Sequence, residues 1–119
     1  MMTNLEQHIM DKVRGRLGAD QLERAIVYLD RDLKRAAERV SVGDVVIDVP
    51  WDGHIVFVDL EPKANWGHAC SYLAIRLDGD EVIEFAAHMP PFLKAETSLF
   101  RLLWRGTLAP EWAVAISPK

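Results

Sequence analysis

Residues 67–89 read GHACSYLAIRLDGDEVIEFAAHM, two apolar segments joined by an Asp-Gly-Asp turn at residues 78–80. An Asp-Gly pair between alternating apolar side chains is the strongest short-range signal for a β-hairpin. The stretch therefore predicts two antiparallel strands, over residues 67–77 and 81–89, and decides that the fold contains a sheet.

The register of this hairpin decides which side chains share a face of the sheet. A two-residue turn would place Leu73 opposite Glu84 and mix apolar with charged side chains. A three-residue turn would place Leu73 opposite Phe85 and make one face almost wholly apolar. Because a slip of one residue exposes every core side chain, the hydrophobic pattern favours the three-residue turn. We predict that register.

The predicted register brings cysteine and histidine together on the other face. Cys70 would lie directly opposite His88, with Cβ atoms about 5 Å apart, and His68 would share their face. In one interpretation Cys70 is the nucleophile of a hydrolase and His88 or His68 is its base, with Glu84 orienting that base. In a second, His68, Cys70 and His88 bind zinc. In a third, the commonest for such residues, they are a buried thiol and hydrogen-bonded imidazoles without a chemical role.

Before the sheet, residues 1–40 predict a helical hairpin. Capping boxes, in which side chains and backbone N–H groups satisfy each other at a helix start, begin at Thr3 and Asp20. The second helix would carry an apolar seam with the 3.5-residue period of a coiled coil. This seam consists of Leu22, Ile26, Leu29, Leu33, Ala36 and Val40. It would pack either on the first helix and the sheet or against another chain.

The rest of the chain predicts further strands and one short helix. Residues 44–49 alternate in polarity, and residues 55–58 are apolar on both faces, as in a central strand. Two prolines end the hairpin, and we expect a short apolar helix within residues 91–106 and a last strand over residues 112–116. The order predicts an α+β fold, with a mostly antiparallel sheet of about five strands.

Composition narrows the class of protein. The 119 residues predict one domain, and 50% apolar with 27% charged residues is typical of a globular chain. A net charge of -4 argues against a nucleic-acid partner, and one cysteine excludes an internal disulfide. No apolar run approaches the roughly 20 residues of a membrane span, so we expect no membrane partner and a cytoplasmic location.

These observations favour a small non-catalytic interaction module without a cofactor. It would self-associate or bind a protein partner through the helical arm, residues 1–40. Loop tryptophans can cap the open ends of a sheet, and they can also anchor partners, because they present a large rigid surface. The expected partner-binding residues are Leu22, Ile26, Leu29, Leu33, Trp51 and Trp66. The alternative is a Cys/His-dependent hydrolase or a zinc-binding protein that uses Cys70, His88 and His68.

Overall fold

The computed structural model describes residues 2–64, 67–91 and 99–114. Its helices are α1 (Asn4–Arg16), α2 (Ala19–Arg24) and the short 3₁₀ helix η2 (Glu111–Ala113). Its strands are β1 (Ile26–Asp30), β2 (Arg39–Val42), β3 (Val45–Asp48), β4 (Gly53–Asp59), β5 (Cys70–Arg76), β6 (Val82–Ala87) and β7 (Phe100–Arg105). Five strands form one antiparallel sheet in the order β6-β5-β4-β1-β7, and β2 and β3 form a separate two-stranded hairpin. The predicted α+β class is confirmed.

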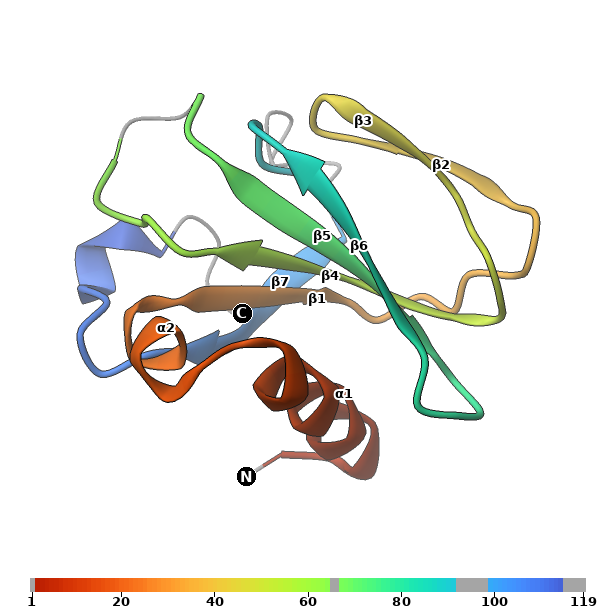
Figure 1. The fold of residues 1–119 in the computed structure, drawn as a ribbon, viewed down its shortest axis with the longest axis horizontal. Coiled ribbons are helices and arrows are strands. Elements are labelled where there is room, and N and C mark those ends of the chain that lie inside the picture. The colour runs from red at the N-terminus through yellow and green to blue at the C-terminus, as the bar shows by residue number, and fades with distance from the viewer. Residues whose placement is uncertain (1, 65–66, 92–98, 115–119) are drawn as a thin grey trace.

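The sheet lies between α1 and the β2–β3 hairpin (Figure 1). On the helical face, Ile9, Met10 and Val13 of α1 pack against the sheet side chains Val27, Leu29, Val56, Val58, Leu73 and Ile75. On the hairpin face, Ile47 and Val49 pack against Tyr28, Phe57 and Tyr72. Covering on both faces explains why β4 is buried along its whole length. Residues 55–58 therefore lie in a central strand, as their composition predicts.

The start of α1 follows the predicted capping box. Glu6 N–H donates to Thr3 Oγ1 at 3.1 Å, and Thr3 N–H donates to Glu6 Oε1 at 2.9 Å. These bonds satisfy backbone donors that the first helical turn leaves without partners. No helix within the described ranges is long and apolar enough to cross a membrane.

The predicted second helix is wrong beyond Arg24. Residues 26–30 form β1, which is buried throughout and pairs with β4 on one side and β7 on the other. The run Ile26-Val27-Tyr28 combines β-branched and aromatic side chains that fit a pleated, buried surface. Its apolar positions coincide with a heptad spacing, but all five residues are buried, which one face of a helix would not give. Residues 1–40 are therefore not a helical arm.

The predicted hairpin register is also wrong. Leu73 pairs with Glu84 and Cys70 pairs with Ala87, the register of the two-residue turn. The hydrophobic pattern favoured the other register only if a charged side chain could not share the face of Leu73. In the structure Glu84 lies on the edge strand, where it accepts a hydrogen bond from Ser71 Oγ at 2.7 Å and pairs with Arg16 of α1 at 3.2 Å.

The third difference concerns the end of the chain. Residues 100–105, expected in a helix, form β7 and pair with β1 through a register shift. Residues 111–113 form a 3₁₀ turn where the last strand was expected to begin. Leu102, Leu103 and Trp104 are apolar on both faces of the strand, and such short runs do not distinguish a buried helix from a strand. The rest of both predicted elements lies partly outside the described residues.

Candidate functional site

The structure separates the predicted nucleophile from its predicted base. Cys70 lies on the hairpin face, 6% exposed, and its Sγ donates to the carbonyl oxygen of Met89 at 3.8 Å. The His88 side chain is 65% exposed, and its Nδ1 lies 3.8 Å from Asp44 Oδ2. Burial, together with the negative charges of Asp59 and Asp44, raises the pKa of the Cys70 thiol to about 12. A thiol in these surroundings stays protonated near neutral pH, unlike the activated thiols of cysteine hydrolases.

His68 is engaged elsewhere. Its Nε2 lies 2.8 Å from Asp59 Oδ1, and both side chains are buried. The same Asp59 oxygen accepts the Glu61 N–H at 3.0 Å. Asp59 therefore ties both ends of the 60–68 loop to the end of β4, which is a structural role for this pair.

The three predicted zinc ligands, His68, Cys70 and His88, likewise do not gather around one point. The described part of the chain contains no group of three or more His, Cys, Asp or Glu side chains that could hold a metal ion. Cys70, His68 and His88 each have a different polar partner, and Glu84 binds Arg16 and Ser71 on the edge of the sheet.

The expected partner-binding residues have different surroundings from those predicted. Ile26 and Leu29 are fully buried in β1, so the folded chain cannot offer them to a partner. Leu22 of α2 and Leu33, after β1, are half-buried. Trp51 is also half-buried, with the Arg76 guanidinium 5.9 Å from its ring centroid. Trp66 lies outside the described residues.

A groove at the end of α2 is the candidate site that the fold creates. It has a volume of about 600 Å³ and lies where α2, the loop after β4 and the turn after β7 meet. Its lining residues are Arg24, Leu60, Glu61, Pro62, Lys63, Ala64 and Leu108. Leu108 is 60% exposed, and Trp112 in the following turn is 73% exposed. Exposed apolar side chains beside a groove are typical of a surface that binds a partner.

Backbone hydrogen bonds hold the α2 wall of the groove. The turn after β7 caps the end of α2, because Leu108 N–H donates to the Glu23 carbonyl at 2.8 Å and Gly106 N–H donates to the Ala25 carbonyl at 2.8 Å. The Trp104 indole N–H donates to the Leu22 carbonyl at 3.1 Å. The Glu23 and Ala25 carbonyls at the end of α2, which the helix leaves without partners, are thereby satisfied.

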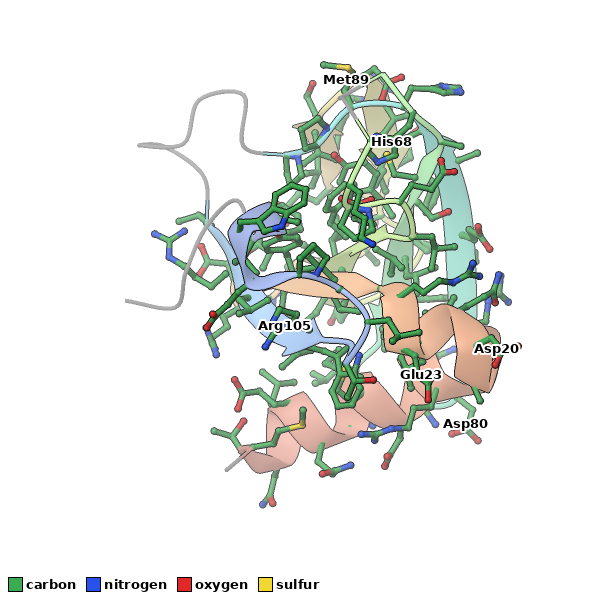
Figure 2. The ribbon with its side chains drawn as sticks, turned by 90° about the vertical axis from the view of Figure 1, so that its left-hand side faces the viewer. Asp20, Glu23, His68, Asp80, Met89 and Arg105 are labelled. Carbon is green, nitrogen blue, oxygen red and sulfur yellow. The ribbon has the colours of Figure 1, made fainter. Side chains whose placement is uncertain are left out.

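Close packing between α2 and the turn after β7 requires glycine at position 106. A Cβ atom there would lie 2.1 Å from the Glu23 carbonyl oxygen, so a larger residue would force the walls apart. Figure 2 views this end of the molecule, with Glu23 on α2, Arg105 on β7 and His68 on the loop before β5.

The Asp59–His68 pair holds the opposite wall. Asp59 is the last residue of β4, and Leu60, the next residue, is the first of the loop that lines the groove. This pair therefore anchors the loop near both of its ends. Sequence analysis missed the groove, since its residues come from three distant segments. The local signals were Gly106, two residues before the lining residue Leu108, and Pro62, two residues after the lining residue Leu60.

Comparison with known proteins finds no matching family model, no matching curated protein and no matching solved structure. The function is therefore argued from the geometry of the chain.

Proposed function

We propose that this protein is a small non-catalytic module that binds a partner protein in the groove beside α2. The observation that carries the proposal is the apolar lining of the groove around Leu108, a leucine that is 60% exposed. Burying such a side chain in a complex gains roughly 25 cal/mol for each Å² of apolar surface removed from water. The hydrogen bonds that hold α2 to the turn after β7 and anchor the loop after β4 limit the entropy that binding loses.

The charges of the groove favour a partner of particular chemistry. Arg24 and Lys63 are exposed cations on its rim, and Glu61 is the one acid in the lining. This rim is net positive on a chain whose net charge is -4. We infer that the occupant is a peptide segment of a partner protein in which an apolar anchor side chain is flanked by an acidic residue. Rim charges of this kind select partners and speed association.

The proposed function is still the protein-binding module expected from the sequence. The binding surface, however, is the groove beside α2 and not the predicted helical seam. The seam residues Ile26 and Leu29 are core, whereas Arg24, at the end of α2, lines the groove. Among the described lining residues, no thiol, hydroxyl or imidazole is present to act as a nucleophile or base. This composition supports binding over catalysis.

A randomised peptide library displayed on phage tests the proposal with a defined probe. We expect selection on the purified protein to enrich peptides with an apolar residue next to Asp or Glu. Binding of an enriched peptide, measured by fluorescence polarisation, should weaken by about tenfold or more in Leu108→Asp, the loss typical of a central anchor. Lys63→Glu should weaken it less and reduce its dependence on salt.

Leu99→Asp is the matched control. Leu99 is 53% exposed and precedes Phe100, which pairs with Asp30 at the end of β1 opposite the groove. This variant should bind the peptide as the parent protein does. Failure to enrich any peptide, or equal binding by Leu108→Asp and the parent, would overturn the proposal.

A further inference from the structure

The outer edge of β6 has no strand paired with it in the described part of the chain. Backbone groups along an antiparallel strand point alternately toward and away from the neighbouring strand. Arg76 N–H donates to the Glu81 carbonyl at 3.1 Å, so residue 81 directs its groups toward β5. By alternation, Val82, Glu84 and Ala86 direct their N–H and C=O groups outward.

One end of this edge is closed by a side chain. Asp44, in the turn between β2 and β3, accepts the N–H groups of His88 at 3.1 Å and of Met89 at 3.2 Å. These hydrogen bonds lower the pKa of the Asp44 carboxyl, His88 contributing most, and so keep it ionised as an acceptor. The capped part of the edge begins at His88, the next residue after Ala86 whose backbone groups point outward. The open edge is therefore limited to the three outward residues of β6.

The open edge carries only one of the devices that usually prevent strands from pairing between molecules, the charged side chain of Glu84. Natural edge strands carry charged residues, above all lysine, or proline or a bulge, or they are covered. The residues of β6 are Val82, Ile83, Glu84, Phe85, Ala86 and Ala87, and they pair with β5 without a register shift. Its one charge, Glu84, is already bound by Arg16 and Ser71. Ile83 is 39% exposed.

We propose that β6 pairs antiparallel with β6 of a second copy of this chain, so that one sheet continues through a symmetric dimer. An antiparallel edge is self-complementary, because a two-fold axis brings each outward donor to an outward acceptor of the same strand. The second copy therefore needs no other sequence to satisfy the edge. This surface is separate from the groove, which lies at α2 and the turn after β7.

Charge selects the register of the pairing. Alignment centred on Glu84 would place two carboxylates directly opposite each other, which is unfavourable. Alignment centred on Phe85 places Glu84 opposite Ala86 of the second copy and brings the two Phe85 rings together. Because Asp44 caps His88, Val82 opposite it stays unpaired, and the pairing is limited to Glu84 and Ala86 of each strand. We infer the second register, in which residue 85 is the one position of β6 that meets itself.

The size of the contact sets the strength of the dimer. Two hydrogen-bonded residues on each strand make an interface smaller than the roughly 1,200 Å² that specific stable complexes bury in total. The dimer should therefore be concentration-dependent, monomeric near about 10 µM and substantially dimeric toward about 1 mM.

Sedimentation velocity and amide hydrogen exchange across this range test the proposal. The amides of Glu84 and Ala86 should exchange rapidly in dilute protein and become protected as the dimer forms. The Val82 amide, opposite the capped His88 of the second copy, should stay unprotected, and the inward amides of Ile83 and Phe85 should be protected at every concentration. A protein that stays monomeric throughout, with the Glu84 and Ala86 amides unprotected, would overturn the proposal.

Ala86→Pro removes one outward N–H and none of the donors that face β5, so it should fold normally and stay monomeric. Ala86→Ser keeps the N–H and is the matched control, which should dimerise as the parent does. A dimer that persists in folded Ala86→Pro contradicts the edge pairing. A dimer lost in Leu108→Asp but kept in Ala86→Pro would assign association to the groove.

Disulfide trapping gives a second readout if Ala86→Pro fails to fold. Under oxidation Phe85→Cys should form a covalent dimer, because a non-hydrogen-bonded antiparallel pair brings the Cβ atoms within disulfide reach. Ile83→Cys is the control and should crosslink far more slowly, since residue 83 would face Ala87 of the second copy. Equal crosslinking of the two variants would contradict the register.

Discussion

The chemistry of Cys70 depends on one residue step in the hairpin. In the register that the structure adopts, its side chain points into the hairpin face beside Tyr72, and Ala87 rather than His88 is its cross-strand neighbour. Burial also raises the pKa of Tyr72, with contributions from Cys70 and Asp44. The thiol and the phenol thus both stay protonated, and both donate to the Met89 carbonyl, Tyr72 Oη at 2.9 Å.

The buried thiol should be almost unreactive in the folded protein. At pH 8 a thiol with a pKa of about 12 is thiolate in only about one molecule in ten thousand. We expect a water-soluble thiol reagent to modify Cys70 at least about a hundredfold more slowly in the folded protein than in urea. A Ser41→Cys variant supplies an exposed thiol as control. Native Cys70 labelling as fast as that control would restore the nucleophile hypothesis.

At the scale of the elements, β1 shows why an apolar period can mislead. The spacing of Ile26 and Leu29 suits one face of a helix, yet β1 is the strand between β4 and β7. Pairing on both sides satisfies its backbone, and α1 and the hairpin bury its two faces. The spacing of apolar residues along a segment carries no information about the strands that will pair with it or the elements that will cover it. The capping box at Thr3 was predictable because all of its atoms lie within one helical turn.

Two alanine substitutions distinguish the observed strand β1 from the predicted helical seam, which would contain both Leu29 and Leu33. Leu29→Ala should lower the free energy of unfolding by about 3 kcal/mol, because it leaves a cavity beneath α1. Leu33→Ala should cost about 1 kcal/mol or less, since Leu33 is half-buried and follows β1. Urea unfolding followed by circular dichroism measures both values. Equal losses would instead indicate a helical seam in which both leucines pack alike.

At the scale of the whole molecule, ionisable groups are buried where α1 crosses the end of the sheet opposite the groove. Lys34 Nζ lies 2.9 Å from Asp30 Oδ2, and both side chains are nearly buried. His54 at the start of β4 is 5% exposed, and its Nδ1 has no hydrogen-bond partner among the described residues. Burial lowers the pKa of His54 from its ordinary value of 6.5; Asp30 opposes this shift, while His8 of α1 and Lys34 add to it.

Stability should therefore fall as the solution becomes acidic. Because the folded pKa of His54 is below 6.5, the unfolded chain takes up this proton first. The stability contributed by the neutral imidazole is present above about pH 6.5 and is lost as the pH falls toward the folded pKa. His54→Gln should flatten the dependence of the free energy of unfolding on pH between about pH 7 and pH 5.

The control for this prediction is His88→Gln, whose side chain is 65% exposed in the parent protein. It should keep the parent pH dependence in urea unfolding at several pH values. An unchanged slope in His54→Gln would show that other groups carry the acid sensitivity.

Sequence by itself determined the features that depend on neighbouring residues: the cap of α1, the presence of a hairpin around Asp78-Gly79, the buried strand at residues 55–58 and the α+β class. Tertiary structure alone decided the strand identity of residues 26–30, the pairing of Cys70 with Ala87 and the groove between Arg24, Lys63 and Leu108. The physical reason is that a local pattern carries no information about which distant segments will pair with or cover it. Contacts between distant segments, such as Arg16 with Glu84, decide the outcome.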